Sequence, residues 1–477
     1  MTYPVITHLV SGRAVTGAGY GRRSVTNPAN GETLAELPFE DAALLIEVAE
    51  TAWRGFQIWR KTPATKRAEV LKRAATYLRR DVETLAHIIT LEQGKILAES
   101  KGEILGTAAI FDWAAEEALR IVTELLPRRE DGFQQAIHHQ AVGPMLAIAP
   151  WNMPALLTGR KIAHALATGS SVIVKPASET PGIAVELVKR LLEAGLPPEA
   201  IAVIHGNSGP IAETLIAAPQ IRKVSFTGST EVGRVLGALC GHHIKRFTAE
   251  LGGHAPVIVL RDADLDRVIP IIAGGKFFNA GQSCMAPTRF FVQSDIAEAF
   301  TEAFAARAVT IQVGNGLEAG MQMGTVINDR AVASMQDFVN DAVTLGARVL
   351  TGGARVGTEG SFFAPTVLAD VPAGARIMQD EPYGPLAPIA SFTTIDQAVF
   401  RANETPFGLC AYVFGHDPRA LRQLTDDLEV GLIGINTLNI GGPSVPFGGV
   451  KDSGIGREGS HYGLLEHMSL KAVTSDA

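Results

Sequence analysis

The sequence predicts an α/β fold with two doubly wound parallel sheets. Two stretches, residues 142–250 and about 255–436, alternate short apolar runs with helical patterns. Strands that are apolar throughout are typical of parallel sheets covered by helices on both faces. The chain of 477 residues is also too long for a single hydrophobic core, so two or three domains are expected.

The elements before the first sheet are expected to be short strands and turns, followed by helices. A turn is predicted at the NPANGE stretch of residues 27–32. From Asp41 to about Leu125 the pattern is helical, for example in residues 67–78, where apolar side chains recur near the 3.6-residue period. These helices are expected to precede the first sheet.

Apolar runs then mark the strands. Those of the first sheet are MLAIAP (145–150), SSVIVKP (170–176), AIAVIHG (200–206) and RKVSFTG (222–228), with a helical stretch from Pro181. This alternation predicts a nucleotide-binding domain. APVIVL (255–260) begins a second α/β region. Residues 120–141 interrupt the first domain, and with LKAVT (470–474) they are expected to form a small sheet that protrudes and docks on a partner subunit.

Composition excludes several functional classes. Hydrophobic residues make up 46% and charged residues 19% of the chain, and the net charge of -7 is spread over both halves. The sequence has no basic stripe, which argues against nucleic acid as a partner. It also has no long apolar run, which argues against a membrane span. The N-terminus lacks a signal-peptide pattern. The three cysteines form no disulfide framework, which favours a reducing cytoplasm.

Three residues could carry covalent chemistry. Cys284 follows Gly-Gln-Ser, which indicates a loop that exposes its thiol; Cys240 and Cys410 are better explained as small buried thiols. Glu250 precedes two glycines, where a backbone approaches a ligand closely. Asn152 has an amide that could donate to an oxyanion. Each residue alone also has an ordinary explanation: a buried thiol, a solvated Glu, and an Asn in a turn.

Two further features point to a dinucleotide. Lys175 ends an apolar strand, where ligands of open α/β sheets bind. In FTGSTEVGR (226–234) a strand ends at Gly228 and a helix begins near Thr230, so the helix amides could hold a phosphate. The Gly-x4-Gly spacing differs from the usual dinucleotide fingerprint and is a weak signal alone.

Together these motifs resemble the aldehyde dehydrogenase superfamily. APWNMP, KPASETP, FTGSTEVG, ELGGHAP, GQSC, EPYGP and PFGGVKDSGIGREG occur in that family's order and spacing, from about Asn27 to Val473. The resemblance is greatest to succinate-semialdehyde and 2-oxoglutarate-semialdehyde dehydrogenases. It implies an aldehyde dehydrogenase-like α/β fold with a dinucleotide-binding domain (1–119 and 142–250), a catalytic domain (251–440) and an oligomerisation arm (120–141 and 460–477) of a homodimer or homotetramer.

The resemblance also implies roles. Cys284 corresponds to the nucleophile, Glu250 to the general base and Asn152 to the oxyanion donor, with no metal. NAD or NADP is the expected cofactor, and its site is expected to include Pro150, Trp151, Lys175, Ser178, Gly209, Phe226, Gly228, Ser229, Leu251, Glu381 and Tyr383. Strict NAD enzymes of this family often carry Glu at the place of Ser178. Ser removes the repulsion of a 2′-phosphate, so use of both cofactors is expected.

The substrate is expected to be a small semialdehyde, bound through Arg160, Phe278 and Phe447. Arg160 matches an Arg that binds a distal carboxylate in semialdehyde dehydrogenases, although it could equally be structural. Phe278 replaces a second Arg, Gly441 replaces a Ser, and Leu156 and Leu157 are apolar. A neutral or aromatic aldehyde therefore stays open. CoA-acylating relatives lack the hydrolytic Glu that is present here, a hydrolase would need no dinucleotide motif, and a non-catalytic protein would be expected to lose the catalytic residues.

Overall fold

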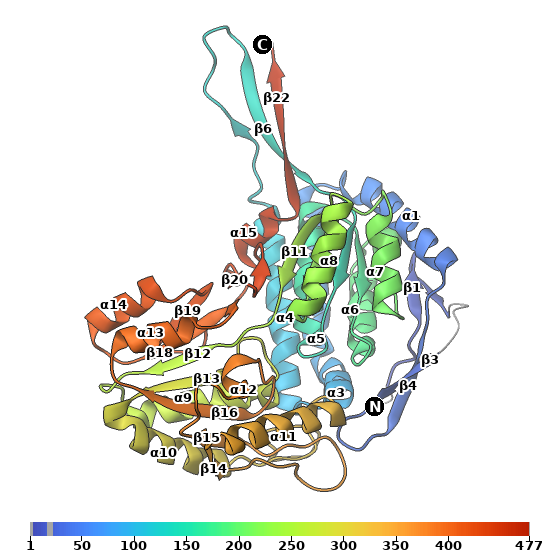
Figure 1. The fold of residues 1–477 in the computed structure, drawn as a ribbon. Helices are drawn as coiled ribbons and strands as arrows, with labels where there is room; N and C mark the ends of the chain where they lie inside the picture. Colours follow the sequence, from blue (N-terminus) through green and yellow to red (C-terminus); the bar gives the residue numbers. More distant parts are fainter. Residues whose placement is uncertain (1–2, 17–21, 477) are drawn as a thin grey trace.

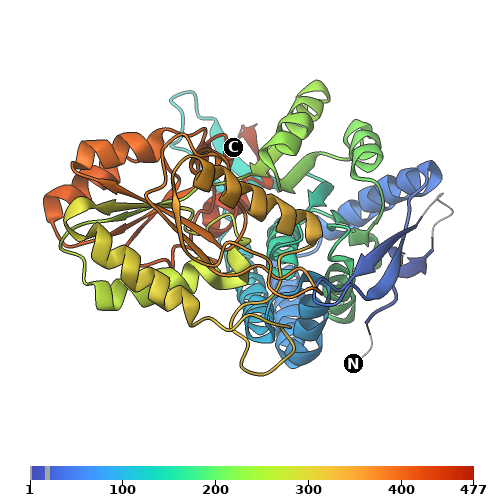
Figure 2. The same ribbon diagram turned by 60° about the horizontal axis from the view of Figure 1, so that its bottom comes forward.

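Two α/β bodies and a protruding arm make up the molecule (Figure 1). The structure is a computed structural model, and it describes residues 3–16 and 22–476. The outermost predicted boundaries, Met1 and Ala477, lie outside these residues. Figure 2 shows the two bodies side by side, with most of the first half of the chain in one and the yellow to orange-red segments that follow in the other.

The first body is built on an eight-stranded sheet in the order β2-β1-β9-β8-β7-β10-β11-β21. Its strands are β1 (His8–Val10), β2 (Arg13–Val15), β7 (Met145–Ile148), β8 (Val172–Lys175), β9 (Ile201–Val203), β10 (Lys223–Thr227), β11 (Arg246–Glu250) and β21 (Gly454–Ile455). The five central strands are parallel, and four of them, β7, β8, β9 and β10, confirm the predicted apolar runs; β11 is not among those runs. The edges differ from the prediction, because β1, β2 and β21 pair antiparallel.

Helices cover both faces of this sheet. They are α1 (Ala42–Trp59), α2 (Ala64–Arg80), α3 (Val82–Gln93), α4 (Leu97–Ala118), α5 (Pro154–Thr168), α6 (Pro181–Glu193), α7 (Ser208–Ala217) and α8 (Thr230–His242). Successive strand residues point to opposite faces, so Met145 and Ala147 join one buried cluster while Leu146 and Ile148 join another. Two cores thus explain why these strands are apolar throughout. Before them, β3 (Arg22–Thr26) and β4 (Thr33–Pro38) form a hairpin around the predicted turn.

The second body contains a seven-stranded sheet in the order β14-β15-β16-β13-β12-β18-β19. Its strands are β12 (Pro256–Val259), β13 (Arg289–Gln293), β14 (Arg348–Thr351), β15 (Thr366–Ala369), β16 (Leu386–Phe392), β18 (Cys410–Phe414) and β19 (Leu432–Ile435). Its helices are α9 (Leu265–Phe277), α10 (Ala297–Val309), α11 (Asp329–Thr344), α12 (Arg376–Gln379), α13 (Ile395–Asn403) and α14 (Pro418–Asp427). All pairs are parallel except that of β14 with β15.

A three-stranded antiparallel sheet forms the arm. Its strands are β5 (Glu124–Leu125), β6 (Gln134–Ala141) and β22 (Met468–Ser475). Figure 1 shows β6 and β22 rising together from the first body, with the C-terminal end at the tip. The short helix α15 (Ser460–Leu465) contacts α4 and α5 instead. The arm sheet therefore takes up only the final part of residues 460–477.

The segment between β19 and α15 returns to the first body. There β21 pairs with β11, while β20 (Val450–Lys451) pairs with β17 (Phe407–Gly408) beside the second sheet. The PFGGVKDSG motif is thereby placed between the two bodies. In the part of the chain that the structure describes, no helix is long and apolar enough to cross a membrane.

Candidate active site

The topology of the first sheet creates a crevice between β7 and β10. From β7 the chain proceeds to β8 and β9 on one side, and then to β10 and β11 on the other. Ligands of open α/β sheets bind at such a switch point, outside the carboxyl ends of the strands. The registers place Ile148 opposite Lys175 and Phe226, and Thr227 opposite Glu250. The predicted residues on three strands therefore end at one edge.

The second body meets this edge with loops that precede its strands. Gly253 comes before β12, Cys284 before β13, and Glu381 before β16. Trp151 from the first body packs edge-on against the Tyr383 ring of the second, with the ring centroids 5.5 Å apart. The site thus lies between the carboxyl edge of one sheet and the amino edge of the other.

A cavity of about 230 Å³ occupies this junction. Its lining consists of Pro150, Trp151, Asn152, Leu157, Thr227, Gly228, Ser229, Leu251, Gly252, Cys284, Glu381 and Tyr383. All but Leu157, Thr227 and Gly252 are residues that the sequence predicted for catalysis or cofactor binding. Other predicted residues do not line it: Lys175, Ser178, Gly209, Phe226, Glu250, Arg160, Phe278 and Phe447.

The loop that carries Cys284 is held in an unusual backbone conformation. Asn279, Ala280 and Gly281 have φ values of 49°, 52° and 72°. A Cβ on Gly281 would lie 2.1 Å from the carbonyl oxygen of Gly384, so glycine is needed there for space as well as for its φ. A left-handed backbone at two non-glycine residues costs conformational free energy, and this cost must be offset by the surrounding contacts.

Hydrogen bonds on both sides of the thiol supply those contacts. The Gln282 side chain donates to the carbonyls of Asn279 (3.0 Å) and Thr325 (3.1 Å), and accepts from the Ile327 amide (2.8 Å). On the other side, the Tyr412 hydroxyl donates to the carbonyl of Met285 at 2.7 Å. The position of the Cys284 backbone is therefore fixed from both directions.

Cys284 is distinguished from the other cysteines by its place. All three thiols are free, but Cys240 and Cys410 are buried in the two cores, where burial raises their pKa to about 11 and about 12. Burial also raises the pKa of Cys284, followed by the negative charge of Glu250. Because the thiolate is the reactive form, this thiol must lose its proton before it can attack a carbonyl carbon.

Glu250 is a buried carboxyl without a hydrogen-bond partner in the described structure. Its residue is 2% exposed, and neither carboxyl oxygen is hydrogen-bonded. Burial raises its pKa well above the ordinary value, and the charge of Glu458 adds to this, while Arg160 and Lys161 oppose it. A carboxyl with a raised pKa in a closed site is suited to accept and return protons near neutral pH.

Asn152 presents its side-chain amide to the cavity. The residue is 2% exposed, and its Nδ2 donates to the carbonyl of Gln282 at 3.3 Å. An amide nitrogen carries two hydrogens, so the second is available to an oxygen bound in the cavity. The Oδ1 atom has no hydrogen-bond partner among the described residues.

The same cavity has features that fit a dinucleotide. A Cβ on Gly228 would lie 2.5 Å from the Phe226 ring, so the turn between β10 and α8 admits only glycine without rearrangement. Ser229 caps α8, whose first amides face the end of the strand and can hold a phosphate. Glu381 accepts from the Gly253 amide at 3.1 Å, and burial raises its pKa to about 8. Its carboxyl can accept from ribose hydroxyls.

Lys175 and Arg160 lie outside the lining but beside it. The Lys175 ammonium is buried, donates to the carbonyl of Pro176 at 3.0 Å and has its pKa lowered to about 8 by burial. The Arg160 guanidinium lies 5.0 Å from the centre of the Phe447 ring. Arg160 is 6% exposed, and within the described residues its side chain makes no hydrogen bond or ion pair.

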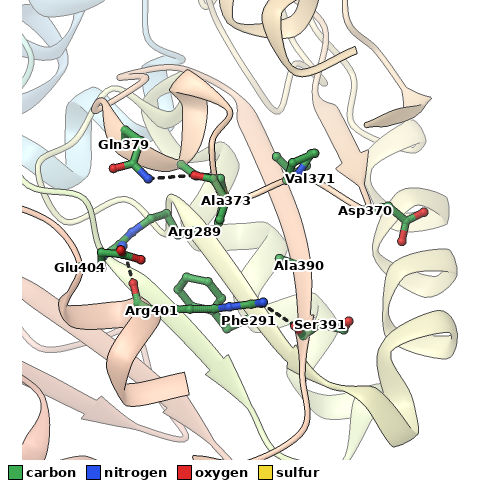
Figure 3. Close-up of a pocket in the computed structure, with 12 residues that line it drawn as sticks. Arg289, Phe291, Asp370, Val371, Ala373, Gln379, Ala390, Ser391, Arg401 and Glu404 are labelled. Atoms are coloured by element: carbon green, nitrogen blue, oxygen red, sulfur yellow. Dashed lines mark hydrogen bonds between the residues drawn. The ribbon is translucent and has the colours of Figure 1, made fainter. Parts of the chain in front are cut away.

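A second cavity, of about 290 Å³, lies in the second body beside β13 and β16 (Figure 3). Arg289 enters it, but its guanidinium donates to the backbone carbonyls of His254, Arg401 and Ala402. Arg401 in turn donates to the carbonyl of Ser391 at 2.7 Å. The two guanidinium groups thus donate to the protein's own backbone, and no cysteine lines this cavity.

Sequence reasoning missed a buried ion pair beside Glu250. Lys161 on α5 pairs with Glu458 and donates to the hydroxyls of Ser225 (3.1 Å) and Thr227 (2.7 Å). The sequence signal was a lysine in the apolar stretch KIAHALA, because such a lysine needs a buried partner. In residues 3–16 and 22–476 no group of acidic, His or Cys side chains could hold a metal ion.

The doubly wound sheets and the cavity at their junction are features of a nucleotide-binding enzyme, and comparison with known proteins gives its family. A sequence model of the aldehyde dehydrogenase family matches residues 15–473. The chain is 42% identical to 4-(hydroxymethyl)benzenesulfonate dehydrogenase of Comamonas testosteroni, over 97% of this chain and 96% of that protein. It is 40% identical to the NADP-dependent succinate-semialdehyde dehydrogenase of Escherichia coli, over 94% and 93%.

Solved structures agree. The succinate-semialdehyde dehydrogenase of Burkholderia pseudomallei superposes with a TM-score of 0.97 at 38% identity, covering 99% of this chain and 98% of that one. The chain belongs to the aldehyde dehydrogenase family, and it is an NAD(P)-dependent aldehyde dehydrogenase. The predicted family and fold are confirmed.

Proposed function

We propose that this enzyme oxidises an anionic small aldehyde to its carboxylic acid, with Cys284 as nucleophile, Asn152 as oxyanion donor and Glu250 as general base. One observation carries the assignment. Cys284 and Asn152 line the same cavity as Gly228, Ser229 and Glu381, the residues that fit a dinucleotide. The carboxyl of Glu250, which has no hydrogen-bond partner in the described structure, is buried close to this cavity. No other cysteine in the chain lines that cavity.

The first half of the reaction uses the thiol. The Cys284 thiol gives its proton to water, and the thiolate sulfur then bonds to the aldehyde carbon and gives a thiohemiacetal. The second Asn152 N–H and the backbone amide of Cys284 donate to the oxygen that becomes negative, a contribution of about 3 kcal/mol per donor. A bound nicotinamide dinucleotide supplies the hydride acceptor. Loss of hydride from the carbon leaves a thioester on Cys284.

The second half uses the carboxyl. Glu250 takes a proton from water as the water oxygen attacks the thioester carbon. The C–S bond then breaks, releasing the carboxylic acid and the Cys284 thiolate, which is protonated again. The charge of Glu458 raises the pKa of this carboxyl, and the charge of Lys161 lowers it.

The substrate class rests on Arg160. The Arg160 guanidinium is buried and forms no ion pair or hydrogen bond with a carboxylate among the described residues, although its charge acts on the carboxyls of Glu250 and Glu458. Such a guanidinium can still bind an anionic group on the substrate. Both relatives are named after anionic compounds: the Comamonas testosteroni enzyme after a sulfonate, and the Escherichia coli enzyme after succinate semialdehyde. The Phe447 ring against Arg160 and the apolar Leu157 also suit a neutral or aromatic aldehyde, which is the alternative substrate.

The cofactor and assembly complete the proposal. We propose that the enzyme accepts NAD and NADP, since Ser178 places no carboxylate near the 2′ position. We also propose that residues 1–119 and 142–250 bind the dinucleotide, that residues 251–440 carry Cys284, and that the three-stranded sheet joins subunits of a homodimer or homotetramer. Leu125, Leu470 and Val473 leave apolar surface exposed on that sheet; sedimentation of the chain with and without residues 468–477 tests this role.

A panel of aldehydes with each cofactor, followed by absorbance of the reduced nicotinamide, tests the proposed function. A short semialdehyde should give the highest kcat/KM, and the neutral aldehyde of equal length should be a poorer substrate. Preference for the neutral or aromatic aldehyde would move the substrate to the alternative. Turnover that requires CoA would replace hydrolysis by acyl transfer to CoA.

A further inference from the structure

An ion pair outside the cavity lies at the start of α4. Lys95 and Glu103 both have fully buried side chains, and Nζ lies 2.6 Å from Oε2. Burying two charges costs more than their attraction returns unless further hydrogen bonds satisfy them. The other contacts of this pair therefore show what it does.

Those contacts hold the turn that carries Asn152. Lys95 Nζ donates to the Asn152 carbonyl at 2.8 Å and to the sulfur of Met153 at 3.1 Å. Glu103 Oε1 accepts from the amides of Ala155 (2.7 Å) and Leu156 (3.2 Å), in the first turn of α5. Met153, the residue before α5, provides no side-chain cap, so a helix distant in sequence caps α5.

The same carbonyl is tied to the nucleophile loop. Asn279 Nδ2 donates to the Asn152 carbonyl at 3.0 Å and to the Gln282 carbonyl at 3.1 Å. The Asn152 side chain donates to that second carbonyl as well. Glu99, also on α4, accepts from the Asn279 amide at 3.0 Å. The turn of Asn152 and the loop of Cys284 are thus both hydrogen-bonded to α4 and the residue Lys95 just before it.

We propose that Lys95 and Glu103 are positioning residues for the oxyanion donor: they touch neither the thiol nor the cavity, and they act by fixing Asn152. The proposal rests on the role of Asn152 given above. It predicts that Lys95 matters only while the Asn152 amide is present. A purely structural ion pair would matter equally with or without that amide.

A double-mutant cycle on kcat separates these two roles, since it measures whether two side chains act through one another. Lys95→Met should lower kcat by about 10- to 100-fold in the parent enzyme, the range for a donor misplaced by about 1 Å. In an Asn152→Ala background the same change should lower kcat less than about twofold. Equal losses in both backgrounds would overturn the proposal. Parent-like kcat in Asn152→Ala alone would instead refute the oxyanion role, and the positioning role with it.

Two further variants keep the test independent of folding. Lys95→Met/Glu103→Met leaves no unpaired buried charge, although it removes the cap of α5. It should therefore lose less Tm than Lys95→Met alone and still show the loss of kcat. A stable double variant with parent kcat would contradict the positioning role. Lys223→Met is the matched control, because Lys223 is equally buried and donates to Thr248 on the neighbouring strand. Its effect on kcat should be the same in both backgrounds.

Discussion

Replacing Asn152 with Ala should separate catalysis from stability in this enzyme. Asn152 lines the cavity, and its amide nitrogen donates one hydrogen to the Gln282 carbonyl while the other has no partner among the described residues. Removing an oxyanion donor of this kind costs about 10²- to 10³-fold in kcat, or about 2.7–4 kcal/mol. Asn152→Ala should lower kcat by that factor.

The expected change in folding free energy is small for the same variant. The lost hydrogen bond to Gln282 is worth about 1 kcal/mol. Against this, Ala removes the buried Oδ1 that has no partner in the described structure, which costs the native protein about 1–3 kcal/mol. With the cost of the small void left behind, the change in unfolding free energy should stay within about 1 kcal/mol.

Three measurements on Asn152→Ala test this reasoning. Steady-state turnover at saturating aldehyde gives kcat, and thermal unfolding gives Tm. Quenching of the fluorescence of Trp151, which lines the cavity, reports cofactor binding. The reasoning holds if kcat falls while Tm and cofactor affinity stay near parent values. A fall of less than tenfold at unchanged Tm would refute the donor role, and a large fall in Tm would show that Asn152 acts through the fold.

The remaining predictions concern substrate, cofactor and pH. Arg160→Leu should raise the KM of a semialdehyde far more than that of a neutral aldehyde of equal length; a parallel rise would make Arg160 structural. Ser178→Glu should raise the KM of NADP more than that of NAD, with an upper limit of about 4 kcal/mol for one like-charge contact at about 4 Å and an effective dielectric constant near 20; equal changes would place 2′ recognition elsewhere. Gly228→Ala puts a Cβ 2.5 Å from an aromatic ring and should weaken binding of both cofactors, whereas Gly241→Ala on α8, where a Cβ meets nothing within 4 Å, should not. Burial raises the pKa of Glu250 in the folded protein. The contribution of this carboxyl to folding stability is therefore complete below the ordinary carboxyl pKa and is lost as the pH rises through the pKa of the folded protein. The Tm of Glu250→Gln should thus rise relative to that of the parent as the pH increases, and a constant difference in Tm would contradict the assigned cost of burial.

Residues on strand ends could be predicted because local patterns fix them. The run VIVK is apolar on both faces, so it must be a central strand, and Lys175 must lie at its carboxyl end. Gly228 follows β10 by the same reasoning, whereas Glu250 is predicted from the two glycines after it, because the run RFTAE of β11 is not apolar. Parallel pairing then brings these ends together without any knowledge of loop geometry.

The contacts that aim the catalytic groups could not be predicted in this way. Lys95 and Asn152 are far apart in the chain, and only packing of α4 on α5 brings them together. The left-handed turn at Asn279 and Ala280 contradicts local preference and persists because tertiary contacts support it. The antiparallel pairing of β21 likewise depends on the return of the chain between the two bodies.

Mass spectrometry of Glu250→Gln after reaction tests the central claim, a thioester on Cys284, most directly. Without the base, hydride transfer should still occur while hydrolysis slows, so the acyl-enzyme should accumulate. With aldehyde and oxidised cofactor we expect one acyl group per chain on the peptide containing Cys284, and about one equivalent of reduced cofactor in a burst. Hydroxylamine should release the acyl group, and Cys284→Ala/Glu250→Gln should carry none. An acyl group on the Cys240 or Cys410 peptide, or a full parental turnover rate without any adduct, would contradict the mechanism.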